Sequence, residues 1–117
     1  MPHIVFDKMI DLSVFSEKFR EIFQKVPILV KIENIFTDKH KRLALLPTVV
    51  IDSKNQNFLI EINVKEEKTT IRLYPKTDPE KTEGVLMALS MLGKLILDIF
   101  PDAHVTKTNI EKMKEVN

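Results

Sequence analysis

A long apolar segment late in the chain, residues 85–100, constrains the fold more than any other feature. Its apolar residues recur at three- and four-residue spacing, which predicts an amphipathic helix. Asp78, Pro79 and Glu80 suit the N-cap and first turn of this helix, and Pro101 ends it. The apolar residues extend beyond one helix face, so we expect contact with more than one layer, such as a sheet and a neighbouring subunit.

A second helix is predicted near the start of the chain. Asp11 or Ser13 can cap its N-terminus, and Pro27 ends it because a proline ring disfavours helical backbone in the preceding residue. The apolar residues that share one face of this helix are Leu12, Phe15, Phe19, Ile22, Phe23 and Val26.

Strand-like segments surround both helices. We expect strands over residues 3–8, 28–36, 43–52, 58–64, 69–74 and 103–110, turns over 53–56 and 65–68, and a solvated tail over 111–117. Pro47 restricts its strand to an edge, a bend or a bulge. The order strand–helix–strand occurs twice. The expected fold class is therefore α+β, with two β-α-β units forming a four-stranded mixed sheet and two helices on one face.

Composition excludes several classes of function. The chain has 117 residues and no cysteine, so it has no disulfide, iron–sulfur cluster, thiol nucleophile or cysteine-ligated zinc. Two glycines are too few for a glycine-rich phosphate loop. The three histidines are scattered without ligand spacing, so we expect no metal and no cofactor. Length fits a single domain over residues 1–117.

Charge and hydropathy predict a cytoplasmic protein. Eighteen basic and 17 acidic residues give a net charge of +1, which argues against nucleic-acid or membrane partners. No targeting signal is evident at the start, and the longest apolar segment falls short of the ~20 residues of a membrane span. The basic cluster over residues 39–42 is expected to be a solvated loop; nucleic-acid binding there is the weaker alternative.

Pro2 is the main candidate for chemistry. If Met1 is removed, the chain begins with a secondary amine on a rigid ring at the start of a strand. An α-amine has a pKa of about 8, and an apolar pocket lowers that pKa further because it disfavours the ammonium. Such an amine is a general base near neutral pH. The alternative is that Met-Pro is an ordinary start with no role.

The segment Met1-Pro2-His3-Ile4-Val5, the helix ending near Pro27, and Ile35-Phe36 followed six residues later by Arg42 resemble the tautomerase superfamily, in particular its 5-carboxymethyl-2-hydroxymuconate isomerases. The resemblance implies the four-stranded fold of macrophage migration inhibitory factor, a homotrimer, and a small enolisable carboxylate as substrate. It implies that Pro2 is the catalytic base.

The same resemblance implies that Arg42 binds the substrate carboxylate, for which a planar guanidinium is suited. The superfamily usually has a second arginine before its second helix. Here Lys76 occupies that segment as a point charge without the bidentate fork, and Arg72 lies one strand-turn earlier. The missing arginine leaves an alternative open, namely a non-catalytic binding or interaction protein with the tautomerase fold.

Overall fold

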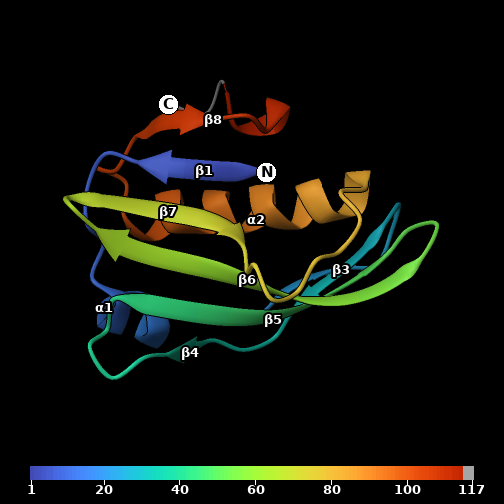
Figure 1. Ribbon diagram of the computed structural model, residues 1–117, viewed down its shortest axis with the longest axis horizontal. Helices are drawn as coiled ribbons and strands as arrows, with labels where there is room; N and C mark the ends of the chain where they lie inside the picture. Colours follow the sequence, from blue (N-terminus) through green and yellow to red (C-terminus); the bar gives the residue numbers. More distant parts are fainter. Residues whose placement is uncertain (115–117) are drawn as a thin grey trace.

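The computed structural model describes residues 1–114, which form eight strands and two α-helices, with six of the strands between the two helices (Figure 1). The elements are β1 (His3–Phe6), α1 (Leu12–Lys18), β2 (Ile22–Gln24), β3 (Leu29–Ile32), β4 (Phe36–Thr37), β5 (Leu43–Ile51), β6 (Asn55–Lys65), β7 (Lys68–Leu73), α2 (Glu83–Ile99), β8 (Val105–Thr108) and the short 3-10 helix η1 (Glu111–Met113).

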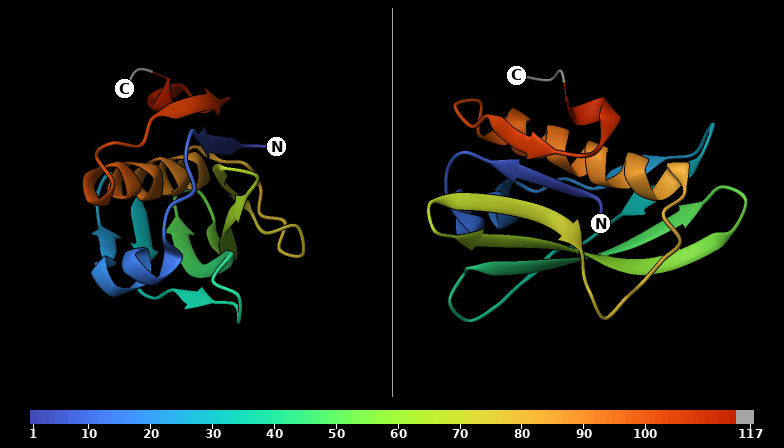
Figure 2. Two further views of the ribbon diagram at one scale, coloured as in Figure 1. Left: turned by 90° about the vertical axis from the view of Figure 1, so that its left-hand side faces the viewer. Right: turned by 45° about the horizontal axis from the view of Figure 1, so that its top comes forward.

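All eight strands belong to one antiparallel sheet. Its order is β2-β3-β5-β6-β7-β1-β8, and β4 also pairs with β5. The sheet curls into a half-barrel, and α2 lies along its inner face (Figure 2). The chain is α+β, but the predicted four-stranded mixed sheet built from two β-α-β units is wrong.

Short connections explain why the sheet is antiparallel. β5 and β6 are joined by three residues, 52–54, and β6 and β7 by Glu66 and Glu67 alone. A parallel neighbour requires a crossover of about a dozen residues, so these three strands can only form hairpins. Both turn residues adopt left-handed backbone, with φ of 51° and 62°. This conformation favours the twist of a two-residue hairpin.

The first helix is much shorter than its apolar periodicity predicts. α1 ends at Lys18, and Phe19 already has extended backbone with φ −58° and ψ 133°. Ile22 then pairs with Ile32 in the sheet, while Phe23 is 54% exposed. Branched and aromatic residues are suited to strands, and pairing with β3 outweighs the helical spacing.

The prediction for α2 is confirmed along its buried side but wrong at its start. The side chains at Val85, Leu89, Leu92 and Ile96 are completely buried. They contribute roughly 1.5–3 kcal/mol each to folding. Contacts to β3, β5, β7, β1, α1 and η1 account for the wide apolar surface within a single chain. The helix begins at Glu83 with Thr82 as N-cap, so Asp78 does not cap it.

The segment before α2 is held by the β5–β6 hairpin instead of joining the helix. Lys54 forms an ion pair with Glu80, and the Glu80 amide donates to the Gln56 side chain at 2.8 Å. The predicted tail is also partly ordered, because Met113 in η1 is fully buried; residues 115–117 lie outside the described residues.

The N-terminus of α2 lies very close to β5. The Gly84 amide donates to Asp52 Oδ2 at 3.1 Å. The Thr82 hydroxyl, together with this amide and those of Lys54 and Ser53, holds the pKa of Asp52 below its ordinary value. A Cβ at Gly84 would overlap Val50 Cγ1 and lie 2.7 Å from Asp52 Oδ2. A side chain at Gly84 would therefore push the helix off the sheet.

We predict that Gly84→Ala destabilises the fold by about 1–3 kcal/mol in denaturant unfolding, because overpacking outweighs the gain in helix propensity of about 1 kcal/mol. Gly93→Ala is the matched control. Its new Cβ would meet only the side-chain ends of Met113 and Ile4, at 2.8 and 3.0 Å, so we expect a smaller loss of stability there. A Gly84→Ala protein as stable as the wild type would contradict the close approach.

Candidate functional site

Pro2 is buried at the start of β1. By strand alternation its ring lies on the same side of the sheet as Ile4 and Phe6, both of which are completely buried in the core. Pro2 is absent from the linings of five surface hollows in residues 1–114. The predicted base is thus sheltered from water and lies outside these five hollows.

The backbone on both sides of Pro2 is held by Asn109. The His3 amide donates to Asn109 Oδ1 at 3.0 Å, and Asn109 Nδ2 donates to the Met1 carbonyl at 2.9 Å. His3 Nδ1 also lies 2.9 Å from the Met1 carbonyl oxygen. The Asn109 side chain extends the β1–β8 ladder past its last backbone pair, so the start of the chain is anchored to the sheet.

Arg42 lies at the opposite end of the sheet from Pro2. The Arg42 carbonyl accepts from the Val64 amide, at the end of β6, and the Arg42 side chain is exposed. The sheet register separates it from Pro2 by three strand spacings and about four residues, or roughly 20 Å. The predicted carboxylate anchor and the predicted base do not converge.

The loop before Arg42 is organised by a single carboxylate. Asp38 Oδ1 accepts from the amides of Arg42 at 2.8 Å and of Leu43 at 3.0 Å. These two hydrogen bonds hold the pKa of Asp38 below its ordinary value. Lys41 adopts left-handed backbone with φ 58°. The basic cluster is therefore a shaped, exposed turn.

The two candidates for the second cation differ in environment. Lys76 is exposed in the turn after β7, at the same end of the sheet as Pro2. Arg72 pairs with His3 across β1 and β7, and alternation places its side chain on the opposite face from Pro2. Its Nε donates to Glu61 Oε2 at 2.7 Å, and the Glu61 carboxylate is 3% exposed. Arg72 therefore neutralises a buried acid.

Metal and membrane sites are not found in the described chain. Residues 1–114 contain no cluster of three side chains that could hold a metal ion. Nor does any helix within them have the length and hydropathy needed to cross a bilayer.

The face of the sheet away from α2 is unusually apolar along β5. We call this the outer face, formed by the outward side chains of β3, β4, β5 and β6. Alternate β5 residues are fully buried against the helix, and those between them point outward and remain partly or largely exposed. These outward residues are Leu43, Leu45, Pro47, Val49 and Ile51.

Pro47 interrupts the ladder beside β5 and opens a hollow there. Ile32 pairs with Thr48 and Phe36 with Leu45, so three residues between β3 and β4 oppose only two in β5. A bulge is one of the three arrangements predicted for Pro47, which lacks an N–H to donate. The resulting hollow has a volume of about 720 Å³.

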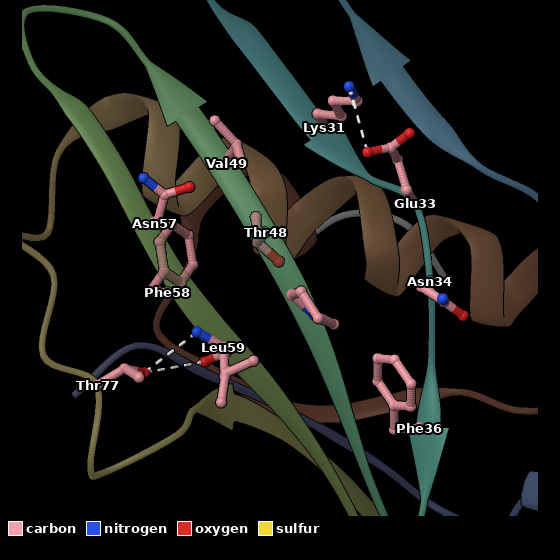
Figure 3. A pocket seen from close by; sticks show the side chains of 11 residues that line it. Lys31, Glu33, Asn34, Phe36, Thr48, Val49, Asn57, Phe58, Leu59 and Thr77 are labelled. Atoms are coloured by element: carbon pink, nitrogen blue, oxygen red, sulfur yellow. Dashed lines mark hydrogen bonds and ion pairs between the residues drawn. The ribbon is translucent and has the colours of Figure 1, made fainter.

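Apolar and polar side chains divide the hollow between them (Figure 3). The apolar part comes from Phe36, which is 58% exposed, with Pro47, Val49 and Leu59. The polar part includes an ion pair between Lys31 Nζ and Glu33 Oε1 at 3.2 Å, and the side chains of Asn34, Asn57 and Thr77. An apolar surface beside polar groups is typical of contact with another macromolecule.

The sequence analysis did not predict an exposed apolar face, although the composition of residues 43–51 indicated one. Residues 43–51 are apolar at eight of nine positions, and a near-continuous apolar strand is typical of burial on both faces. The structure covers only one face with α2.

Comparison with known proteins adds no relative: no family model, curated protein or solved structure matches this chain. The resemblance to the tautomerase superfamily therefore has no support beyond the residues that suggested it.

We predict that Arg72→Met destabilises the protein by about 2 kcal/mol, because it leaves the buried Glu61 carboxylate without its cation. The double variant Arg72→Met/Glu61→Gln should recover part of that loss, since a neutral amide costs less to bury. Chemical denaturation of the three proteins measures both effects. An Arg72→Met protein within ~0.5 kcal/mol of the wild type would show that the pair contributes nothing.

Proposed function

We propose that this protein is a non-catalytic interaction module that binds a protein partner through its outer face. The observation that carries the proposal is the outward side of β5, which is apolar throughout yet partly exposed. Exposed apolar patches rimmed by polar residues are typical of protein–protein contacts. Phe36 and Ile51, 58% and 40% exposed, project from this face.

The positions of the predicted catalytic residues favour binding over catalysis. A reaction of the tautomerase type requires a base and a carboxylate anchor around one cavity. Pro2 is buried on the helix side of the sheet, whereas Arg42 and Lys76 are exposed at opposite ends. The hollow on the outer face contains none of the three.

Isomerisation by Pro2 is the second candidate, and the burial of Pro2 is the observation that favours it. Burial disfavours an ammonium and would make a free Pro2 amine a better base. The wide apolar surface of α2 is a weaker argument for the trimer that the resemblance implies, because most of that surface is covered within one chain. Ketonisation of phenylenolpyruvate by the untagged protein, lost in Pro2→Ala, would favour isomerisation over the interaction module.

The interaction module is tested by photocrosslinking in the cells that produce the protein. Benzoylphenylalanine at position 36 replaces one exposed aromatic ring with another, and the same residue at the exposed position Glu17 of α1 is the control. We expect a covalent product from position 36 that is lost when Val49→Asn is added, because a polar side chain there weakens an apolar contact. Peptide mass spectrometry identifies the partner.

Folding of each variant is checked by circular dichroism, because Val49 is only half-buried and Asn should be tolerated there. Equal crosslinking from positions 36 and 17, or a product indifferent to Val49→Asn, would overturn the proposal.

A further inference from the structure

We infer that the partner is a second copy of this chain, related to the first by a two-fold axis that passes over Pro47. The inference rests on the proposed function and names the occupant of the outer face. It follows from the symmetry of the outward residues of β5 and of the residues that flank them.

The apolar pattern of β5 is symmetric about Pro47. Leu45 and Val49 lie two residues to either side of it, and Leu43 and Ile51 lie four residues to either side. The proposed two-fold axis lies midway between the outer faces of the two copies and runs perpendicular to β5. It makes the β5 strand of the second copy antiparallel to that of the first. It brings Leu45 against Val49 of the second copy and Leu43 against Ile51. Such a self-complementary surface is what an isologous dimer requires.

The same axis matches the residues on the β3–β4 side. Phe36 pairs with Leu45, and Lys31 pairs with Val49. Because the axis exchanges the positions of Leu45 and Val49, it places the exposed Phe36 ring over Lys31 of the second copy. An ammonium against an aromatic face is a favourable contact. Glu33, 3.2 Å from Lys31 Nζ, keeps that cation on this face.

The residues on the β6 side match as well. Leu59 pairs with Pro47, so it lies near the axis and meets its own copy. Asn57 pairs with Val49, which places it opposite the Glu61–Arg72 pair of the second copy. An amide both donates and accepts hydrogen bonds, so it suits a pair that carries both signs of charge.

Other arrangements fit less well. An axis parallel to β5 would place Phe36 over the Glu61–Arg72 pair of the second copy, where the guanidinium is already paired with the buried carboxylate, and would leave Lys31 against Asn57. A strongly charged partner such as a nucleic acid would find one ion pair and several amides around the hollow, with no excess of one sign. A net charge of +1 also leaves little repulsion between two copies.

The absence of cysteine allows a direct test, because one introduced cysteine can crosslink only to the same cysteine in a second molecule of the protein. Facing sheets pack about 10 Å apart, which is too far for a disulfide but within reach of a short bismaleimide. The purified Pro47→Cys protein should therefore give a dimer in high yield. Lys94→Cys, exposed on α2 away from this face, should give only the background of random collision.

Two further variants test the direction of the axis. Asn55 pairs with Ile51 and Asn63 pairs with Leu43, so the axis brings these two asparagines together across the interface. Asn55→Cys alone should give no dimer, because its two copies lie about 26 Å apart along the strands. A mixture of Asn55→Cys and Asn63→Cys proteins should crosslink. A dimer from Asn55→Cys alone would overturn the proposed axis.

Affinity gives a second readout by sedimentation of the wild type and of single variants. Each substitution occurs twice in a symmetric dimer. If the loss of one Phe36 ring raises the dissociation constant about 10-fold, Phe36→Ala should weaken association about 100-fold. Val26→Ala, 75% exposed outside the outer face, should leave association unchanged. A wild type that stays monomeric at millimolar concentration would overturn self-association.

The failures of the two proposals are distinguishable. A Val49-dependent photocrosslink from position 36 to a different protein, with no dimer from Pro47→Cys, would retain the interaction module and reject the second copy. The absence of both products would reject both.

Discussion

The structure depends on the burial of α2 against the inner face of the curled sheet. One helix fills the half-barrel, and its contacts to β1, β3, β5 and β7 bring together strands from both ends of the chain. The close approach at Gly84 and the hydrogen bond to Asp52 fix where the helix begins. Most of this apolar segment is thus buried within the chain, while Leu86, Met87, Met91 and Leu97 stay partly exposed.

That packing determines which surface is left for function. With the inner face covered, the outward side of β5 is where apolar side chains remain exposed beside polar groups. The bulge opposite Pro47 hollows this face, because a residue without an N–H cannot continue the ladder. Pro2 is instead part of the anchored, buried start of β1, tied by Asn109 to the end of β8.

Part of this fold was readable from the sequence and part was not. The strands around residues 43–74 and the buried stripe of α2 follow from local spacing and turn residues, while the sequence left an edge, a bend or a bulge open at Pro47. The end of the first helix could not be predicted in this way. Ile22 and Phe23 fit a helical face and a strand equally well, and only pairing with β3 favours the strand. Similarly, Asp78 and Thr82 are both good helix caps, and the contacts of Glu80 to the β5–β6 hairpin select Thr82.

The candidate site shows the same division. Residue types alone establish that the chain has no thiol chemistry, no phosphate loop and an apolar strand at residues 43–51. The resemblance implied that Pro2 and Arg42 act together, but their separation depends on strand order, which places three strand spacings between them. Local sequence determined most of the segments that extend or coil, with residues 19–26 as the exception, because those preferences act over a few residues. The tertiary structure decided which faces are covered, because one helix can bury only one side of a sheet.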